Sequence, residues 1–384
     1  MKAAVLGYGT VGAGVYSMLS YAPGMEAGPV LVRPGKAVES FMVSDAALIF
    51  GDPTVDAVVE TLGGLDPAYS YGMRALEAGK HFITANKVMV ASHGLELAAL
   101  AREKGVAFLF SAACGGGVPF LHNLALSAET DRIEAVSGIL NGTTNYMLDA
   151  MQRRGLSYGD ALREAQSLGY AESDPTADVS GLDALRKMQL ACAVAFGVLP
   201  QSGMLCEGME HFTAADVEDI QSRGLVCRLM ARGSRAGESV SAYVEPVLFP
   251  RAAPESSVFT NNNMARYTGK RCGSIVLMGQ GAGRFPTASA VLRDLAAAQQ
   301  GARSMFPENC RAAEADNREA VHSYYIRTGG FAAVRLPLRS VLAQGEVVRA
   351  VTEPMSAEKM HALAQNIRKD GNDLFFAALE EELC

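Results

Sequence analysis

The chain opens with a short apolar strand, a glycine-rich turn and an amphipathic helix. The apolar run covers residues 3–7, the turn reads GYGTVG at 7–12, and apolar residues then recur at helical spacing. A GxGxxG turn in this setting is typical of folds that bind dinucleotides. Gly7 allows the tight turn, Gly9 lets backbone amides approach a pyrophosphate, and Gly12 lets the helix pack closely on the strand. The alternative is a glycine-rich turn with only a packing role.

Strand and helix patterns then alternate through the first third of the chain. Strand patterns cover 56–61, 80–84 and 106–111, and helical patterns cover 67–78 and 93–104. This alternation predicts an α/β fold of the Rossmann type, a doubly wound parallel sheet that binds ligands beyond the carboxyl ends of its strands. Lys87 follows such an end and can reach a phosphate, the nicotinamide or the substrate. A lone lysine in a loop after a strand is otherwise usually solvated.

The second strand pattern ends in basic residues, at the point where dinucleotide enzymes distinguish their cofactors. An NAD enzyme should carry Asp or Glu about 20 residues after the last glycine. Here Val32 occupies that place, and Arg33 and Lys36 follow it. Because a cation suits a 2′-phosphate, we expect NADP to be preferred, with NAD also possible. The alternative is an exposed arginine in a turn.

The segment 169–187, GYAESDPTADVSGLDALRK, places four acids ahead of one lysine. Ser180 with Asp183 three residues later resembles a capping box, so we expect a helix to begin near Ser180. Asp183 and Lys187 are spaced i,i+4 on one face of that helix, which continues into an apolar run. Pro175 forbids helix at residue 174 and should keep the acidic segment extended. Such a site can hold a cationic substrate and protonate it; the alternative is a surface salt bridge.

Glycine is concentrated in two later turns. AACGGGVP at 112–119 leads into a helix, and GQGAGRFPT at 279–287 leads into a helix at 288–300 that should return to the nucleotide domain. Glycine density of this kind indicates close approach of the backbone to a ligand, an ion or another strand. Between these turns, NGTTNY at 141–146 joins a strand to a helix, which suits either polar substrate recognition or ordinary capping.

The rest of the chain predicts a middle α+β region and a small C-terminal segment. The middle region has a helix at 213–223 with its own capping box and strands within 225–249 and 264–279, and we expect an antiparallel sheet covered by helices. Residues 301–320 resemble a linker. Beyond them we expect strands at 323–327, 347–351 and 374–379 and a helix from Ser356 to about 367. The expected domains are 1–125 with about 280–310 for the dinucleotide, 126–279 for catalysis and dimerisation, and 320–384 as an appendage.

Composition excludes several classes of function. The net charge is −7 with no basic cluster, which argues against a nucleic-acid surface. No apolar run approaches the length of a membrane span. The seven cysteines show no CxxC spacing, which indicates reduced thiols in a cytoplasmic protein rather than a disulfide framework or a zinc site. They are Cys114, Cys192, Cys206, Cys227, Cys272, Cys310 and Cys384.

Over roughly residues 1–300 the assembled motifs resemble the homoserine dehydrogenases. Seven motifs in the same order are far more specific than GxGxxG alone. They are GYGTVG at 7–12, VVETLGG at 58–64, ALEAGKHFITANK at 75–87, GGGVP at 115–119, GILNGTTNYML at 138–148, GYAESDPTADVSGLDALRK at 169–187 and GQGAGRFPTASAV at 279–291. The resemblance implies reversible NAD(P)H-dependent reduction of L-aspartate 4-semialdehyde to L-homoserine, in the aspartate-derived pathway to threonine, methionine and isoleucine.

The resemblance also implies roles for individual residues. Lys187 would donate a proton to the aldehyde oxygen, and Asp183 would orient it. The substrate would be bound by Glu172 and Asp178 at its amino group, with Tyr170, Thr143 and Lys87 around it. The cofactor would be bound by Gly7, Gly9, Thr10, Val11, Gly12, Arg33, Lys87 and Gly281. Because a lysine must lose its proton to act as a base, oxidation of homoserine should favour alkaline pH.

Two features depart from the family pattern. Ser111 replaces a glutamate that commonly helps to hold a sodium or potassium ion, although the backbone carbonyls of Cys114, Gly116 and Val118 can still bind a monovalent cation. The C-terminal segment resembles a shortened ACT-type regulatory domain without its aspartate–proline–glycine turn, so threonine inhibition should be weak or absent. The family also implies a homodimer or a higher homo-oligomer.

Three alternatives remain at this stage. The chain can be another Rossmann oxidoreductase that acts on an amino-acid carbonyl. A phosphorylating semialdehyde dehydrogenase would need a catalytic cysteine with a histidine partner, and Cys114 is the lone candidate. A cofactor-sensing homologue without catalysis is the third alternative.

Overall fold

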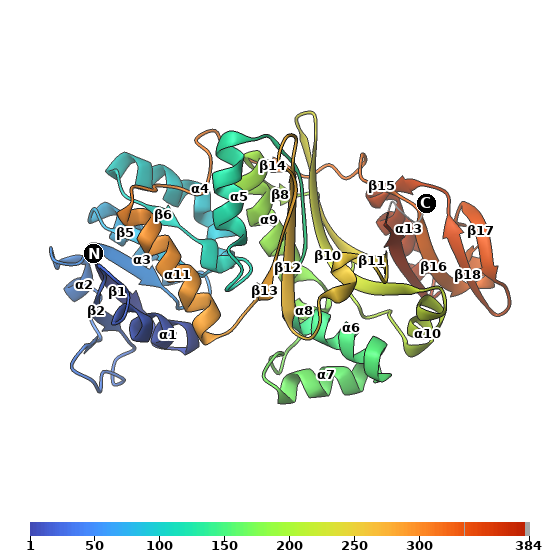
Figure 1. Cartoon of the computed structure of the whole chain (residues 1–384), viewed down its shortest axis with the longest axis horizontal. Helices are drawn as coiled ribbons and strands as arrows, with labels where there is room; N and C mark the ends of the chain where they lie inside the picture. Colours follow the sequence, from blue (N-terminus) through green and yellow to red (C-terminus); the bar gives the residue numbers. More distant parts are fainter. Residues whose placement is uncertain (334, 381–384) are drawn as a thin grey trace.

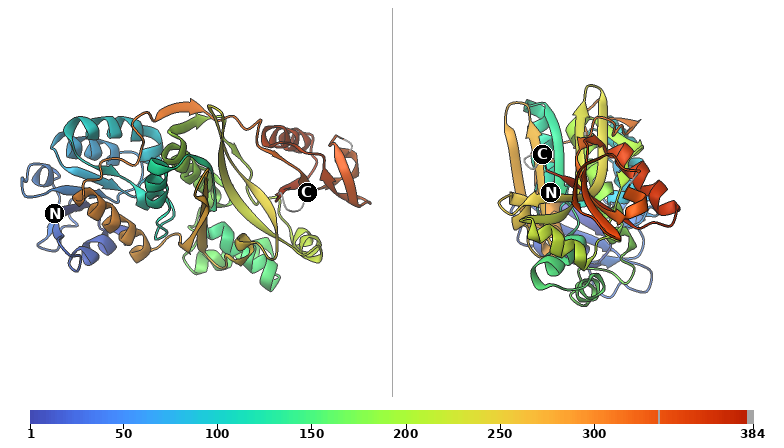
Figure 2. Two further views of the ribbon diagram at one scale, coloured as in Figure 1. Left: turned by 45° about the horizontal axis from the view of Figure 1, so that its top comes forward. Right: turned by 90° about the vertical axis from the view of Figure 1, so that its right-hand side faces the viewer.

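The computed structural model describes residues 1–333 and 335–380. Figures 1 and 2 show an elongated molecule with the N-terminal part at one end and the C-terminal part at the other. Six of the cysteines are free, and Cys384 lies outside the described residues. Within the described ranges, no helix is long and apolar enough to span a membrane.

The N-terminal part is a six-stranded parallel sheet in the order β3-β2-β1-β4-β5-β6, which confirms the predicted Rossmann-type fold. Its central strands β1 and β4 are buried along nearly their whole length because helices cover both faces of the sheet. The strands are β1 Lys2–Leu6, β2 Glu26–Leu31, β3 Met42–Val43, β4 Ala57–Glu60, β5 His81–Thr84 and β6 Phe108–Leu109. The helices are α1 Thr10–Leu19, α2 Ala47–Phe50, α3 Ala68–Glu77 and α4 Lys87–Lys104.

The helix α11 Arg284–Gln299 returns to this part, as predicted, and packs on α1. The contact is so close that a Cβ on Gly14 would lie 2.8 Å from the carbonyl oxygen of Arg284. Because Gly14 has no side chain, the start of α11 packs directly on α1, which places the glycine-rich turn before α11 near the sheet's carboxyl edge.

The middle of the chain forms one side of a ten-stranded sheet in the order β13-β12-β7-β10-β11-β20-β16-β18-β17, with β9 Leu205–Cys206 paired to β11. Its antiparallel strands are β7 Ile133–Ile139, β10 Leu225–Ala236, β11 Ser239–Pro250, β12 Asn262–Gly269 and β13 Gly273–Gln280. Its helices are α5 Phe120–Thr130, α6 Gly142–Arg154, α7 Tyr158–Ser167, α8 Thr176–Val179, α9 Leu182–Phe196 and α10 Ala214–Ser222. The capping box predicted for α10 is present at Thr213 and Asp216.

The helix α9 connects the two sheets. It packs on β7, β10 and β11 on one side and on α4 and α5 on the other. Twelve of its side chains are buried, because both sides of the helix face protein. Residues on its first turns are therefore held rigidly between the two parts of the molecule.

The C-terminal segment is not a separate appendage. Its strands β16 Tyr324–Gly329, β17 Leu338–Ala343, β18 Val347–Thr352 and β20 Leu374–Leu379 continue the ten-stranded sheet, because β20 pairs in parallel with β11. With α12 Gly330–Ala333 and α13 Ala357–Lys369 they form a β-α-β-β-α-β unit in which β20 and β16 are neighbours. We call residues 324–380 the C-terminal module. The predicted linker is wrong in part, since β14 Arg311–Glu314 pairs with β8 Val198–Ser202.

The predicted capping box at Ser180 is wrong. α9 begins at Leu182, and its cap is Gly181, whose φ of +84° lies in the left-handed region that glycine tolerates. The Ser180 hydroxyl makes no hydrogen bond within the described part of the chain. The reason is that the Asp183 carboxylate is engaged in ion pairs and does not cap the helix.

Two further boundaries differ from the prediction. Residue 174 is not helical, as expected, but the acidic segment is not extended throughout, because α8 begins directly after Pro175. Proline is tolerated there since the first amides of a helix lack partners. The helix expected at 93–104 begins six residues earlier, at Lys87, because Asn86 caps it by accepting a hydrogen bond from the amide of Met89 at 3.1 Å.

Candidate active site

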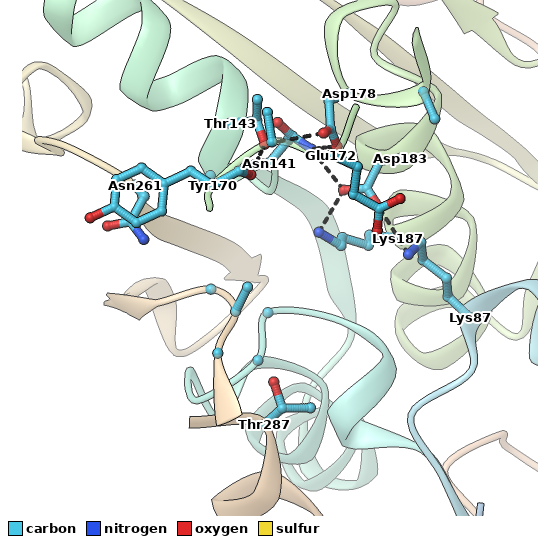
Figure 3. A pocket seen from close by; sticks show the side chains of 18 of the residues that line it. Lys87, Asn141, Thr143, Tyr170, Glu172, Asp178, Asp183, Lys187, Asn261 and Thr287 are labelled. Atoms are coloured by element: carbon cyan, nitrogen blue, oxygen red, sulfur yellow. Dashed lines mark hydrogen bonds and ion pairs between the residues drawn. The ribbon is translucent and has the colours of Figure 1, made fainter. Parts of the chain in front are cut away.

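A cavity of about 610 Å³ lies between the carboxyl edge of the parallel sheet and the α8–α9 segment (Figure 3). Its walls come from the end of β5, the loop after β6, the start of α6, residues 168–187 and the turn before α11. The structure brings all of the predicted substrate and catalytic residues together here. They are Lys87, Thr143, Tyr170, Glu172, Asp178, Asp183 and Lys187, and Gly116 and Gly281 also line the cavity.

Asp183 is the centre of the charged cluster. Its carboxylate lies 2.7 Å from Nζ of Lys187 and 2.9 Å from Nζ of Lys87. Nζ of Lys187 also donates a hydrogen bond to the carbonyl oxygen of Leu140 at 2.6 Å. Only 12% of the Lys187 side chain is exposed, so the surface salt bridge considered as an alternative is excluded.

Burial and charge act in opposite directions on these groups. Burial of Lys187 would lower the pKa of its ammonium, but the Asp183 carboxylate more than offsets this and raises the pKa. Burial of Asp183 would raise its pKa, yet Lys187 and Lys87 hold it well below the ordinary value. Lys187 is therefore a charged donor at neutral pH.

A second acid, Asp178, lies beside this cluster. Asn141 Nδ2 donates to Asp178 at 2.7 Å and to Asp183 at 3.0 Å, and so holds both carboxylates. The Thr143 hydroxyl lies 3.1 Å from Asp178. Burial raises the pKa of Asp178 against the lowering effect of the Asn141 hydrogen bond.

The sequence prediction missed Asn141 as a site residue. It is the cap of α6, where its Oδ1 accepts a hydrogen bond from the amide of Thr144 at 2.8 Å. Capping therefore uses the Oδ1 atom and leaves Nδ2 to bind the two carboxylates. The signal was the NGTTNY turn, which left capping and recognition open. Arg186, Asn261 and Thr287 also line the cavity and were not predicted.

Tyr170 and Glu172 lie on the exposed side of the cavity. The Tyr170 carbonyl accepts a hydrogen bond from the Thr143 hydroxyl at 2.6 Å, while its ring packs edge-on against Tyr146 at 5.1 Å and points away from Lys187 (Figure 3). Tyr170 thus meets the charged cluster through its backbone rather than its ring. The Glu172 side chain is exposed and makes no hydrogen bond or ion pair within the described ranges, which leaves its carboxylate available to a ligand.

The two glycine-rich turns pack against each other. A Cβ on Gly116 would lie 2.4 Å from the carbonyl oxygen of Gly281, and one on Gly281 would lie 2.0 Å from Asn263. The amide of Gly117 donates to the carbonyl of Gln280 at 3.0 Å. This glycine density predicted close approach of the backbone to a ligand, an ion or another strand. The structure shows close approach of one backbone segment to another.

Ser111, at the start of the first of these turns, is bound by a buried carboxylate. Its hydroxyl lies 2.5 Å from Asp294 Oδ1 and its amide 2.8 Å from Oδ2. Burial raises the pKa of Asp294 to about 7, against the lowering effect of these bonds. The carboxylate of Asp294, from α11, thus lies against the position where the family pattern has a glutamate.

Cys114 lacks the features of a nucleophile. Its thiol is fully buried, burial raises its pKa to about 12, and Sγ faces the carbonyl of Lys187 at 3.8 Å. A reactive cysteine needs a lowered pKa and access to substrate. The phosphorylating semialdehyde dehydrogenase considered above is therefore not supported.

A second pocket, of about 880 Å³, lies at the other side of the parallel sheet's carboxyl edge. Gly7, Gly9, Arg33 and Lys36 line it, with the aromatic rings of Tyr8, Phe41 and Tyr71, which were not predicted. A Cβ on Gly9 would meet nothing within 4 Å, so the turn leaves open space for a ligand. Of the other residues predicted to bind cofactor, Thr10, Val11 and Gly12 form the first turn of α1 and do not line this pocket. Gly12 packs against the turn, since its Cβ would lie 2.1 Å from the carbonyl of Gly7.

Lys87 is fixed by a network at the carboxyl ends of β4 and β5. Buried Glu60 accepts hydrogen bonds from the Thr84 hydroxyl at 2.5 Å and the Leu62 amide at 2.6 Å, and burial raises its pKa. Asn86 donates to the carbonyl of Gly64 at 2.6 Å and caps α4. Lys87 therefore begins α4 in one orientation, toward Asp183.

Comparison with known proteins agrees with this geometry. The chain matches the homoserine dehydrogenase NAD-binding domain over residues 7–111 and homoserine dehydrogenase over residues 119–296. The homoserine dehydrogenase of Corynebacterium glutamicum is 38% identical over 316 residues, which are 77% of this chain and 71% of the relative. That of Synechocystis is 37% identical over 319 residues, 77% of this chain and 72% of the relative.

Solved structures agree along nearly the whole chain. A homoserine dehydrogenase from Thiobacillus denitrificans has a TM-score of 0.88 at 29% identity, and the match covers 99% of this chain and 98% of that one. The enzyme of S. aureus has a TM-score of 0.78 at 26% identity, with 99% of each chain covered. This chain belongs to the homoserine dehydrogenase family, whose members are NAD(P)-dependent oxidoreductases that act on a CH–OH group.

Proposed function

We propose that Lys187 is the proton donor and acceptor in the interconversion of L-aspartate 4-semialdehyde and L-homoserine. The observation that carries this assignment is a buried ammonium 2.7 Å from Asp183 inside a cavity lined by acids. A bound nicotinamide would supply or accept the hydride at the carbonyl carbon. As negative charge develops on the aldehyde oxygen, Lys187 stabilises it and transfers its proton, which leaves homoserine and a neutral amine.

Asp183 acts through Lys187. Its second carboxylate oxygen binds Lys87 at 2.9 Å, so it holds two ammonium groups at one wall of the cavity. In oxidation the steps reverse, and Lys187 must first lose its proton. Because Asp183 raises the pKa of Lys187, oxidation should be faster at alkaline pH.

The acids at the mouth of the cavity suit the amino group of the substrate. Glu172 and Asp178 are assigned to the ammonium, with the Thr143 hydroxyl and the Tyr170 carbonyl beside them. Lys87 is assigned to both substrate and cofactor because it lies at the carboxyl edge of the sheet and faces Asp183. A zwitterion then meets carboxylates on one side and ammonium groups on the other.

The preferred cofactor in this proposal is NADP. Arg33 and Lys36 line the second pocket, and neither makes an ion pair among residues 1–333 and 335–380. The open space at Gly9 fits the close approach of a pyrophosphate, as the fold family implies. The cofactor contacts proposed for Thr10, Val11, Gly12 and Gly281 rest on their place in the two glycine-rich turns.

A monovalent cation at the loop after β6 is proposed as an auxiliary group. The carbonyls of Cys114 and Gly116 accept no hydrogen bond from the described residues, whereas that of Val118 accepts one from Phe120 at 2.7 Å. These oxygens are hard ligands of the kind that sodium and potassium use. Rates in sodium, potassium and tetramethylammonium chloride at equal ionic strength test the site, and equal rates in all three would remove it.

The proposal also covers the roles of the domains, dimerisation and the location of the protein. Residues 1–125 with about 280–310 would bind the dinucleotide, 126–279 would carry substrate and dimer contacts, and 320–384 would be a shortened ACT-like segment with weak or no threonine inhibition. A dimer is supported by the edge strand β13, which exposes Val276 (43%) and Met278 (60%) beside an unpaired backbone edge. The free cysteines suit a cytoplasmic location.

Initial rates of NADPH and NADH formation from L-homoserine, measured side by side, test the proposed function. We expect turnover with both cofactors and a higher kcat/KM with NADP. Binding of NADPH without turnover of homoserine would instead favour the cofactor-sensing homologue.

A further inference from the structure

The C-terminal module reaches toward the active site through one ion pair. Arg368 of α13 donates two hydrogen bonds to Glu207, at 2.9 Å and 2.6 Å. Its guanidinium also donates to the carbonyl of Leu374 at 2.7 Å, so it is anchored within the module. Glu207 is buried, and a bidentate pair of this kind fixes orientation as well as charge.

The segment 205–209 that carries Glu207 lies directly against the junction of α8 and α9. The amide of Met209 donates to the carbonyl of Val179 at 2.9 Å, and Sγ of Cys206 lies 3.0 Å from the carbonyl of Ser180. Gly208 has no room for a side chain, since a Cβ there would lie 2.3 Å from the carbonyl of Val179. At Gly208 the contact is therefore between the two backbones.

This junction carries both acids of the charged cluster. Asp178 precedes Val179 by one residue, and Asp183 follows Gly181 by two. A Cβ on Gly181 would lie 3.1 Å from Sγ of Cys206, and the residue holds a left-handed turn. A shift of segment 205–209 would thus move Asp178 and Asp183 relative to Asn141.

We infer that Glu207 and Arg368 are positioning residues, through which the C-terminal module holds the α8–α9 junction in its catalytic geometry. The inference rests on the proposed roles of Asp178 and Asp183. The module would then affect the reaction itself. Its helix α13 packs on β9 Leu205–Cys206, and β9 belongs to the segment that contacts the junction carrying the two acids.

A second ion pair of the module provides a matched comparison. Glu380 accepts a hydrogen bond from Arg232 of β10 at 2.6 Å, the same shortest distance as in the pair of Glu207 and Arg368. It also joins the module to the catalytic sheet, but neither partner bonds to residues 179–181. Glu380→Gln therefore removes an equivalent ion pair without touching the junction.

The experiment compares Glu207→Gln with Glu380→Gln in the full-length enzyme. We expect Glu207→Gln to lower kcat/KM for homoserine about three- to thirty-fold, the range of energetic coupling through packed networks, with NADPH affinity within about twofold of wild type. Glu380→Gln should keep kcat/KM within about twofold even where its Tm falls equally. Tm values and NADPH titrations on the same preparations separate positioning from stability.

Two further variants complete the test. Arg368→Gln and the double variant Glu207→Gln/Arg368→Gln should lose no more kcat/KM than Glu207→Gln alone, because all three break one link. If Arg368→Gln does not fold, Gly208→Ala replaces it in the test. This substitution disturbs the contact between segment 205–209 and the junction directly and should give the same kinetic change. Equal kinetics for Glu207→Gln and Glu380→Gln would overturn the inference, while wild-type turnover of homoserine would leave the proposed function intact.

Discussion

The two pockets at the carboxyl edge of the parallel sheet differ in how their charges are held. In the substrate cavity, Asp183, Lys187 and Lys87 are bound to one another before any ligand arrives. In the second pocket, Arg33 and Lys36 are exposed and form no ion pair in the described ranges. The charges of the first site are therefore held in place before a ligand binds, whereas those of the second would be held only by a bound ligand.

This difference predicts where each substitution should act. Fixed charges in a buried cavity stabilise charge that develops during the reaction, so their loss should reduce kcat. Solvated cations that close on a phosphate contribute binding to ground state and transition state alike, so their loss should raise the KM of the cofactor. Five substitutions test this division.

Lys187→Ala should have the largest effect. Loss of a positioned acid–base group should reduce kcat for homoserine about 10²- to 10⁴-fold, while the Kd of NADPH changes little. Initial rates and fluorescence titration with NADPH measure the two quantities. Lys270→Ala, at an exposed turn, is the control. Near-normal kcat in Lys187→Ala would refute the assignment of the proton donor.

Asp183→Asn should come next, with a loss in kcat of about 100-fold and a shifted pH profile. The Asp183 charge raises the pKa of Lys187, so its removal should lower that pKa. Since oxidation needs neutral Lys187, the rise of the oxidation rate with pH should move to lower pH. A pH–rate profile of homoserine oxidation measures the shift. An unmoved profile would mean that Asp183 does not control Lys187.

The charged cluster shows how far sequence reasoning reaches. The i,i+4 spacing of Asp183 and Lys187 predicted their ion pair, because that contact is local to one helix. The ion pair with Lys87 and the bridge made by Asn141 join residues far apart in the chain, and only the packing of α9 between two sheets brings them together. The predicted capping box was wrong for a related reason, since the Asp183 carboxylate is paired with two lysines and does not cap the helix.

The C-terminal module marks another limit. Its strands β16, β18 and β20 and its helix α13 were predicted from local strand and helical patterns, whereas β17 was not. Its union with the catalytic sheet depends on the pairing of Val247 with Ala378, and no pattern within either strand specifies that neighbour. The four-residue α12 was also not foreseen, since one turn leaves no periodic signal.

Arg33→Ala tests the second pocket. Hydrogen bonds to a charged group are worth about 1.5–3 kcal/mol, so the KM of NADP should rise about 10- to 100-fold. The KM of NAD, which lacks the 2′-phosphate, should stay nearly constant and is the internal control. Steady-state kinetics with both cofactors measure the ratio. An equal rise for both would place Arg33 at the pyrophosphate or the adenosine instead.

Tyr170→Phe should have the smallest effect, although Tyr170 lines the substrate cavity. Its carbonyl, which accepts the Thr143 hydrogen bond at 2.6 Å, is kept in phenylalanine, and its ring faces Tyr146 rather than Lys187. We expect kcat/KM for homoserine within about twofold of wild type. Thr143→Val removes the hydroxyl that donates to the Tyr170 carbonyl and lies 3.1 Å from Asp178. An acceptor left without its donor costs about 1–3 kcal/mol, so kcat/KM should fall about tenfold or more. A large loss of kcat/KM in Tyr170→Phe would show that the ring turns into the cavity when substrate binds. This wall of the cavity would then differ from the Asp183 cluster, because it would reach its final arrangement only with substrate bound.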